Sequence, residues 1–337
     1  MKRGLISFLS LWIMLTSTLA SGQLTAEELV VYSGRSDKFI KPVIKEFTAK
    51  TGIKVTLHSG SSTSLLNKLK LEGKRTSADL YISNDAGNLQ KGSELNLFQP
   101  VDAKLVEVIP ANLRAKDNSW IGLSARARVL VVSTKDKSLD FVKSVFDLAD
   151  PSLKGKLAIT HSSNGSYIAG VTVYLRSTDS KKVKSWLAGM KSNVGVSVFN
   201  KHSKIVKAVA DGRKSIGLVN HYYIYRHLAK HPDAPIKIVM PDQGKNGMGV
   251  AWNVAGVAVV KHSSKKKAAS QLIEYMVSEA GQKLFAEVNR EYPARSGVSA
   301  AAVVPKRSSY KIADVPMTEL GQYRNATLDI IEAVGMP

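Results

Sequence analysis

The alternation of apolar and amphipathic segments over residues 28–83 constrains the fold of this chain more than any other feature. Three apolar segments have the length and composition of buried strands: 30–32, 53–57 and 78–83. Two intervening segments repeat apolar side chains at helical spacing: Phe39, Val43, Ile44 and Phe47, then Leu65, Leu66, Leu69 and Leu71. Gly52 and Gly73 stand where these helices should end. This order predicts a parallel sheet with helical crossovers, and therefore an α/β fold.

The same alternation continues through the rest of the 337 residues. Further strands are expected at 129–132, 156–160, 216–219, 236–240 and 253–260. Further helices are expected at 181–190, 203–210, 222–230 and 265–285, the last as one long helix. The chain is long enough for two domains, and no segment rich in Pro, Gly and Ser separates two halves. We therefore expect two α/β lobes joined by continuous strands.

The first 20 residues have the pattern of a secretory signal peptide. Lys2 and Arg3 precede a mostly apolar stretch at 5–15, and small residues favour cleavage after Ala20 or, alternatively, after Gly22. The apolar stretch is too short to span a bilayer comfortably. We therefore expect a protein that is exported from the cytoplasm with cleavage of residues 1–20 and is not inserted in the membrane.

The chain is strongly basic and lacks cysteine. It has 48 Lys and Arg residues against 27 Asp and Glu residues, a formal charge of +21, which falls to +19 when the signal peptide is removed. Such a charge points to an anionic partner, and export argues against nucleic acid as that partner. The absence of cysteine excludes disulfides, thiolate metal sites and a cysteine nucleophile.

A run of tyrosines, Tyr222, Tyr223 and Tyr225, follows the predicted strand 216–219. In α/β sheets, ligands bind at the carboxyl ends of strands. A phenolate oxygen is a hard anionic donor that suits a hard, highly charged cation, and a metal ion can deprotonate tyrosine at neutral pH. The alternative interpretation is aromatic packing, and the residues alone leave both open. His227 and His231 are better explained as cations near a helix end than as metal ligands.

A small polar turn follows the predicted strand 156–160. Residues 162–166 read Ser-Ser-Asn-Gly-Ser, and such a turn at a helix start can hold an anion with backbone N–H groups and hydroxyls. The alternative is an ordinary helix cap. The sequence contains no phosphate-binding P-loop, no Gly-x-Ser-x-Gly elbow and no dinucleotide-binding glycine motif, so no enzyme class is indicated.

These segments together resemble the periplasmic ferric-iron-binding proteins of ABC importers, in the class II solute-binding superfamily. The similar segments, in order, are 31–35, 47–55, 78–80, 85–88, 124–128, 147–151, 220–223 and 291–293. The resemblance implies a two-lobed class II periplasmic-binding-protein fold, with two α/β lobes joined by crossing hinge strands. The first lobe would contain residues 24–125 and 255–300, and the second residues 126–254 and 301–337.

The resemblance also implies a binding site for Fe³⁺ and a synergistic anion, which could be carbonate, phosphate or citrate. Tyr222 and Tyr223 would be the paired phenolate ligands, and Tyr167 is a candidate third. Residues in three parts of the chain would hold the anion: Arg126, the turn formed by Ser163, Asn164, Gly165 and Ser166, and Asn220.

The first lobe departs from the family pattern. Relatives place a His where this chain has Ser36 and Asp37, and some place a Glu at the position of Asn84. Asp37 or Asp85 could substitute as a metal ligand, or the first lobe could supply none. We favour Asp37 as a residue that caps the helix near Phe39.

The function implied is that of a carrier, not an enzyme. We expect a monomer that delivers ferric iron to an inner-membrane ABC permease. Within the same fold, two alternatives remain open: binding of a thiamine-like organic cation, and binding of an oxyanion such as a phosphonate. A basic secreted enzyme or a nucleic-acid binder is the alternative from a different class.

Overall fold

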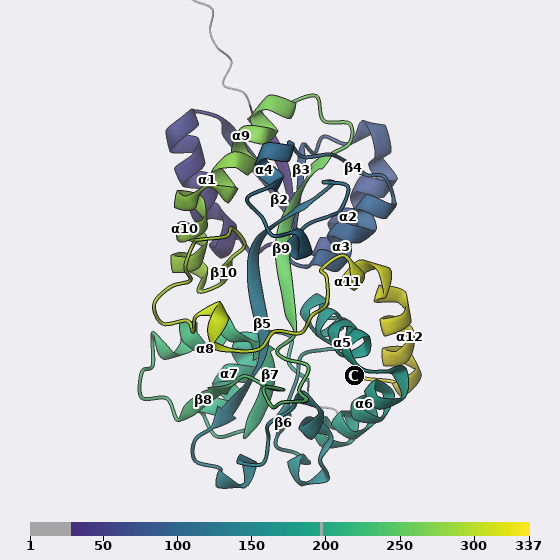
Figure 1. The fold of residues 1–337 in the computed structure, drawn as a ribbon, viewed down its shortest axis with the longest axis vertical. Helices are drawn as coiled ribbons and strands as arrows, with labels where there is room; N and C mark the ends of the chain where they lie inside the picture. Colours follow the sequence, from purple (N-terminus) through teal and green to yellow (C-terminus); the bar gives the residue numbers. More distant parts are fainter. Residues whose placement is uncertain (1–27, 196–197) are drawn as a thin grey trace, which may run out of the picture.

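The computed structural model describes residues 28–195 and 198–337, which form two α/β lobes, one above the other in Figure 1. The predicted signal peptide, residues 1–20, lies outside the described residues. None of the described helices combines the length and the apolar character needed to cross a membrane.

The first lobe is built around three parallel strands, as the sequence pattern predicts. β1 (Glu28–Ser33) lies between β2 (Lys54–Ser59) and β3 (Leu80–Ser83) and pairs with both in parallel. The crossover helices are α1 (Asp37–Thr51) and α2 (Ser62–Glu72), and α3 (Ala86–Glu94) follows β3. Gly52 ends α1 in the left-handed region, at φ 73°, where the lack of a side chain avoids strain.

The second lobe has the strands β6 (Leu157–Ala158), β7 (Ile216–Asn220) and β8 (Ile236–Val239). Its helices are α5 (Gly165–Ser177), α6 (Ser180–Val194), α7 (His202–Ala210) and α8 (His221–Leu228). Apolar residues at regular helical spacing predict helices at 181–190 and 203–210, and these correspond to α6 and α7. The sequence analysis expected a helix to start at the turn 162–166 but did not give the extent of α5. Its apolar residues extend around most of the helix because it is buried between the lobes' crossing strand β9 and the helices α6 and α12.

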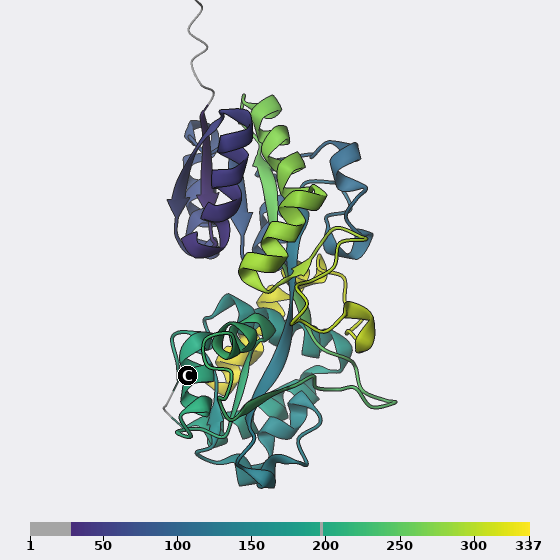
Figure 2. The same cartoon turned by 90° about the vertical axis from the view of Figure 1, so that its left-hand side faces the viewer.

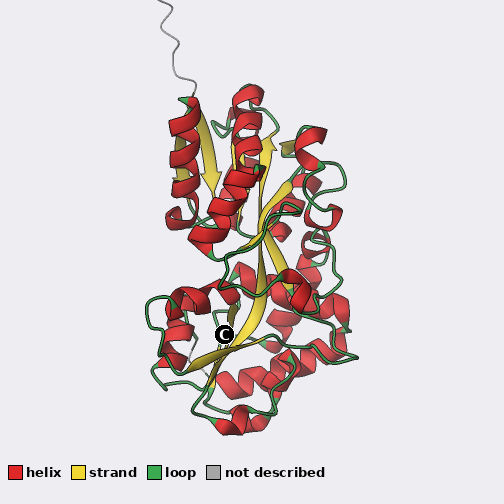
Figure 3. Ribbon diagram, turned by 60° about the vertical axis from the view of Figure 1, so that its left-hand side comes forward, coloured by secondary structure: helices red, strands yellow, loops and turns green. Residues whose placement is uncertain are grey.

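Two strands cross from one lobe to the other, β5 (Ile121–Ser133) and β9 (Trp252–Val260). They pair antiparallel at the centre of a sheet of order β2-β1-β3-β9-β5-β7-β6, and Figure 3 shows them passing between the lobes. Every residue of both strands is buried. The predicted lobe boundaries, 125/126 and 254/255, fall inside these strands. The predicted α/β fold of two lobes joined by crossing strands is confirmed.

The remaining elements are short, except for a helix near the C-terminus. They comprise β4 (Phe98–Gln99), β10 (Tyr292–Pro293), α4 (Ala103–Val106), α11 (Glu319–Gln322) and α12 (Arg324–Val334). Single turns of 3-10 helix lie at Gly73–Arg75, Ala111–Leu113, Lys137–Leu139, Val145–Ala149, Pro151–Leu153 and Arg307–Ser309. The C-terminal segment contacts both lobes, because α11 lies against α3 and α12 packs on α5 and α6.

The prediction of one long helix at 265–285 is wrong. The structure has two helices, α9 (Lys266–Val277) and α10 (Glu279–Asn289), separated by Ser278 in an extended conformation, with ψ at 160°. The Ser278 hydroxyl accepts a hydrogen bond from the Gly281 N–H at 3.1 Å and so caps α10. The helical spacing of apolar residues continues from α9 into α10, so it does not indicate the break. The break is marked only by the Ser278 cap.

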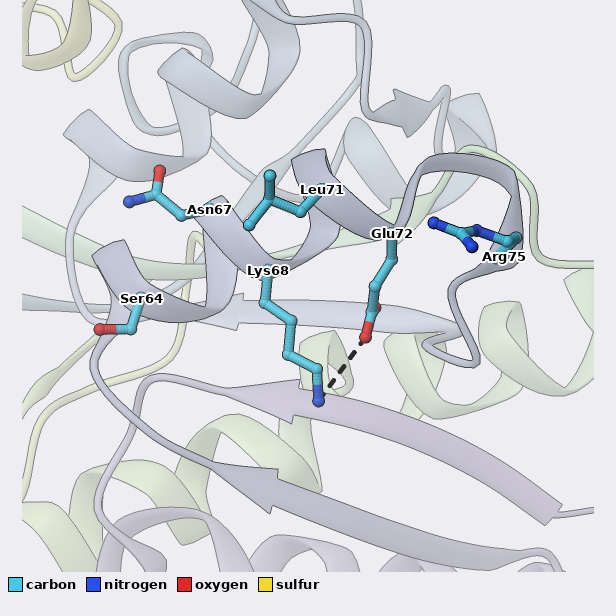
Figure 4. Close-up of a pocket in the computed structure, with 6 residues that line it drawn as sticks. All are labelled: Ser64, Asn67, Lys68, Leu71, Glu72 and Arg75. Carbon is cyan, nitrogen blue, oxygen red and sulfur yellow. Dashed lines mark ion pairs between the residues drawn. The ribbon is translucent and has the colours of Figure 1, made fainter.

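Leu71 also differs from its predicted place on the buried face of α2. Its side chain is 80% exposed, whereas Leu65, Leu66 and Leu69 are buried. Figure 4 shows Leu71 beside the exposed ion pair of Lys68 and Glu72, whose Nζ and Oε1 atoms are 3.7 Å apart. Residue 71 lies two positions after Leu69, about 200° around the helix, so it faces solvent.

A buried ion pair fixes the first lobe to the hinge. The Arg35 guanidinium donates to Glu291 Oε2 at 2.7 Å and to Ser124 Oγ at 3.1 Å, and Ser124 Oγ itself donates to Glu291 at 2.7 Å. Arg35 follows β1, Ser124 lies on β5, and Glu291 precedes β10. Burial raises the pKa of Glu291, but Arg35 and then Arg126 lower it by more, so its net pKa is below the ordinary value.

We expect Glu291→Gln to destabilise the protein by about 3–5 kcal/mol, because it leaves the Arg35 charge buried without a partner. Urea denaturation measures the free energy of unfolding. Glu287→Gln is the matched control, since Glu287 pairs with Arg290 at the surface with its side chain 64% exposed, and its loss should cost less than about 1 kcal/mol. Similar effects of the two substitutions would contradict the structural role of the buried pair.

Candidate metal and anion site between the lobes

A cleft of about 560 Å³ lies between the lobes and is lined by both. The first lobe contributes Gly34, Ser61, Ser62, Thr63, Asn84, Asp85 and Asn88. The rest of the lining comes from the second lobe and the C-terminal segment: Arg126, Ser163, Asn164, Gly165, Ser166, Ile168, His202, Tyr222, Tyr223, Arg324 and Leu328. The structure thus brings together Arg126, the turn 163–166 and the tyrosine pair, which are far apart in the sequence.

The tyrosine pair lies in the first turn of α8, directly after the end of β7. The ring centroids of Tyr222 and Tyr223 are 4.4 Å apart, with the ring planes inclined by 35°. Tyr222 also makes an edge contact with Phe39 of the first lobe, 5.7 Å between centroids. Burial, and next the neighbouring Tyr222, raise the pKa of Tyr223 above its ordinary value. Its phenol is therefore neutral at physiological pH unless a cation replaces the proton.

Tyr225, the third tyrosine of the run, lies elsewhere. Its ring is in edge contact with His221, 6.2 Å between centroids, and it does not line the cleft. The packing interpretation therefore describes Tyr225, whereas Tyr222 and Tyr223 both line the cleft.

The turn 163–166 begins α5, and its amides are partly used by the protein. Asn164 Oδ1 accepts hydrogen bonds from the N–H groups of Ser166 at 3.0 Å and Tyr167 at 3.4 Å, so Asn164 is a helix cap. Gly165 brings the turn close to the other lobe, because a Cβ built there would lie 3.5 Å from Asp85 Oδ2. An anion at this turn would meet hydroxyl groups and side chains more than free amides.

Two buried arginines lie at the floor of the site: Arg126 lines the cleft, and Arg128 lies behind it without lining it. Arg126 and Arg128 lie two residues apart on β5, so their side chains extend from the same face of the strand. Each is only 3% exposed, and in the described part of the chain their Nε and Nη2 atoms have no hydrogen-bond partner. Burial lowers the pKa of Arg128 to about 10, which keeps it charged at neutral pH. The floor therefore carries positive charge that the described residues leave partly uncompensated.

Asn220 lies at the end of β7, behind the cleft. Its Nδ2 donates to Ser166 Oγ at 3.3 Å, and its Oδ1 accepts from Arg128 Nη1 at 3.4 Å. Asn220 thus connects the buried guanidinium to the turn at the start of α5, without itself lining the cleft.

Two of the predicted metal ligands are not brought to the cleft. Tyr167 is 1% exposed inside the second lobe, near Arg128, and burial raises its pKa above the ordinary value. Asp37 lies on the outer surface of α1, where it accepts from Ser59 Oγ at 2.7 Å and pairs with Lys41 Nζ at 2.7 Å. Asp37 is the first residue of α1 and its side chain bonds to Ser59 and Lys41, so the expectation that it caps this helix is wrong.

Three further residues line the cleft. The sequence analysis gave His202 and Arg324 no role and left Asp85 only as a possible metal ligand. Asp85 accepts from the N–H of Asn88 at 2.9 Å and lies 3.8 Å from Arg324 Nη1, a pair that links β3–α3 of the first lobe to α12. His202 starts α7, with its ring 5.2 Å from that of Tyr223. The sequence could not indicate His202 or Arg324, because neither belongs to a motif and only the tertiary fold brings them here.

Within the described residues, no group of three or more His, Asp or Glu side chains is placed to hold a metal ion. The rings of Tyr222 and Tyr223 lie side by side in the cleft, and their phenol oxygens are hard donors.

Comparison with known proteins agrees with this geometry. The sequence pattern of the bacterial extracellular solute-binding proteins covers residues 43–311. The chain belongs to this family. Iron uptake protein A1 of Synechocystis is 31% identical over 302 residues, covering 88% of this chain and 83% of that protein.

Two solved structures show the same fold. Iron-bound HitA from Pseudomonas aeruginosa superposes with a TM-score of 0.86 at 25% identity, covering 92% of this chain and all of that one. The Trichodesmium protein IdiA (FutA), in complex with iron and citrate, has a TM-score of 0.81 at 30% identity. This comparison also covers 92% of this chain and all of that one. The resemblance to ferric-binding proteins is confirmed. The family consists of solute-binding transport proteins that serve ABC permeases in general, not of enzymes.

The buried histidines predict how stability depends on pH. Burial lowers the pKa of His202 well below its ordinary value of 6.5 and that of His221 to about 4. Each therefore binds a proton only after unfolding, so the free energy of unfolding should fall as pH drops from about 6.5 toward 4, by up to about 1.4 kcal/mol per pH unit for each histidine. Urea denaturation across this range measures the slope. His202→Gln should flatten the slope, and His58→Gln, at an exposed position, should leave it unchanged; an equal slope in both would refute this account.

Proposed function

We propose that the protein is a periplasmic carrier that binds ferric iron between its lobes, with Tyr222 and Tyr223 as ligands and an anion completing the coordination, and delivers it to an inner-membrane ABC permease. One observation carries the proposal: two phenols lie side by side in a cleft that is lined by the buried, incompletely paired guanidinium of Arg126, with that of Arg128 buried behind it. Relatives named for iron uptake and structures that contain iron support it.

The charges in the cleft favour an anion with more than one negative charge. Two phenolates neutralise two of the three charges of Fe³⁺, and Arg126 and Arg128 add two more positive charges in a buried setting. Buried charges need compensation, since the interior screens them poorly. Carbonate, phosphate and citrate all fit this requirement, and citrate accompanies iron in the Trichodesmium relative. The hydroxyls of Ser163 and Ser166 would complete the contacts.

The first lobe would act mainly by closing the cleft. Asp85 reaches across toward Gly165 and pairs with Arg324, so it links the two sides when the lobes are close. Closure over the ligand excludes water and strengthens the electrostatic interactions inside. No covalent bond is made or broken in this cycle.

An oxyanion without metal is a second candidate, because the buried guanidinium groups of Arg126 and Arg128 would suit a phosphonate as well. Colour separates the two candidates. A ferric–phenolate complex absorbs visible light, whereas an oxyanion complex does not. Elemental analysis and a visible spectrum of protein purified without chelator therefore test the proposal directly.

We expect Tyr222→Phe and Tyr223→Phe each to weaken ferric binding by about 100-fold or more, because each removes a metal ligand. Loss of a residue that only orients a ligand already costs ~10–100-fold in metal affinity. The rings and their packing are retained, so both variants should fold. Competition with a ferric chelator and the visible band measure the loss.

Tyr225→Phe is the matched control, since the same hydroxyl is removed from the same helix outside the cleft. It should bind iron as the parent does. Unchanged ferric affinity in both the Tyr222 and Tyr223 variants would overturn the metal proposal and favour an organic or oxyanion ligand.

We expect Asp37→Asn to change ferric affinity by no more than a few-fold, because Asp37 lies on the outer surface with Ser59 and Lys41. Asp85→Asn should weaken binding about tenfold, which is ~1.4 kcal/mol, because Asn still caps α3 but no longer attracts Arg324 across the cleft. The same chelator competition measures both. A larger loss for Asp37→Asn than for Asp85→Asn would place Asp37 at the metal.

A further inference from the structure

A second cavity, of about 860 Å³, lies outside the cleft, beneath the segment 293–312. This segment runs from β10 back toward the second lobe along one side of the hinge, as Figure 2 shows at the right. It returns to the crossing strands where the Val250 N–H donates to the Lys311 carbonyl at 2.9 Å. The cavity therefore lies beside the part of the molecule where the lobes are joined.

The cavity has an aromatic wall. Tyr292 and Tyr310 line it, with ring centroids 6.1 Å apart, and Trp252 packs behind Tyr292 at 4.9 Å. Tyr292 is 2% exposed and Trp252 is 3% exposed. The two phenol groups and the indole nitrogen lie near one another, and they have no hydrogen-bond partner among the other described residues.

The charged part of the lining is entirely positive. It contains Arg295, Lys306 and Arg307, and no Asp or Glu is among the residues that line the cavity. The Arg307 guanidinium carbon lies 5.0 Å from the centre of the Trp252 ring, a cation–π contact at the edge of the aromatic wall. The proposed iron function uses none of these side chains.

We propose that this cavity binds a small aromatic anion, that is, a planar ring bearing a carboxylate or a sulfonate. The volume is that of a small-molecule pocket. The ring would pack on Tyr292 and Tyr310, and the acidic group would meet Lys306 and Arg307. The site is separate from the cleft, so the proposal goes beyond the iron function.

The cavity is connected to the tyrosine pair through His221. The ring of His221 lies 4.8 Å from that of Tyr292 and 5.7 Å from that of Tyr222. Its Nδ1 accepts from the Ala127 N–H at 3.1 Å on one crossing strand, and its Nε2 donates to the Arg290 carbonyl at 2.9 Å. A ligand that displaces Tyr292 therefore shifts the residue that precedes Tyr222. This part of the inference, a change in iron affinity, rests on the proposed function.

The binding test uses 2-naphthalenesulfonate, which is aromatic and anionic and does not chelate iron. We expect calorimetry on the iron-free mature protein to show one saturable site. The double variant Lys306→Ala/Arg307→Ala should weaken binding at least tenfold. The matched control Arg213→Ala/Lys214→Ala removes two adjacent cations from a turn of the second lobe, after α7, and should leave binding unchanged.

Equal weakening in the two double variants would mean that the basic surface attracts the probe non-specifically, and it would overturn the proposal. Absence of saturable binding would overturn it too. Neutral 2-naphthalenesulfonamide should bind at least tenfold more weakly than the sulfonate, and equal binding would refute the role of charge.

The link to iron is tested separately, by measuring ferric affinity with and without saturating 2-naphthalenesulfonate. We expect a shift of at least threefold, and the reciprocal shift in sulfonate affinity when iron is bound. No shift would overturn the link while leaving the binding site in place. A protein that binds the sulfonate but no iron would overturn the proposed function alone, so the two failures are distinguishable.

Discussion

One buried strand, β5, supports both lobes and the site between them. Its thirteen residues are all buried, and it pairs with β9, β7, β8 and β10. A strand in this position can carry charged side chains only where the surrounding structure or a ligand compensates them. It carries two, Arg126 and Arg128, at the level where the lobes meet. The cleft and its charge therefore follow from the way this strand is placed.

The buried arginines of the hinge fall into two kinds. Arg35 has a carboxylate at 2.7 Å and a serine at 3.1 Å, so its charge is compensated within the protein although its Nε has no partner among the described residues. Arg126 and Arg128 each keep guanidinium nitrogens without a protein partner in the described residues, close to the two tyrosines. A paired charge holds a fold together, whereas an unpaired one at the floor of a cleft is ready for an external anion.

His221 lies where the site, the hinge and the second cavity, beneath the segment 293–312, meet. It is fully buried and hydrogen-bonded to one crossing strand and to the end of α10, and its ring makes an edge contact with Tyr222 and a tilted contact with Tyr292. A residue so constrained transmits small displacements between its neighbours, because packed interiors leave little free volume. Lobe closure on iron and binding of a ligand in the second cavity would therefore act on the same side chain.

The sequence by itself determined the α/β class, the parallel strands of the first lobe and the tyrosine pair at a strand end, because these depend on local periodicity and on residue chemistry. It did not reveal the break at Ser278 or the extent of the buried helix α5, since a cap or full burial overrides the apolar period. The exposed place of Leu71 was also missed, although it follows from the position of residue 71 around the helix. Only the tertiary structure brought His202, Arg324 and Asp85 to the tyrosines and kept Tyr167 and Asp37 away. Those placements depend on tertiary contacts between segments that lie from about twenty to more than two hundred residues apart, which no local pattern encodes.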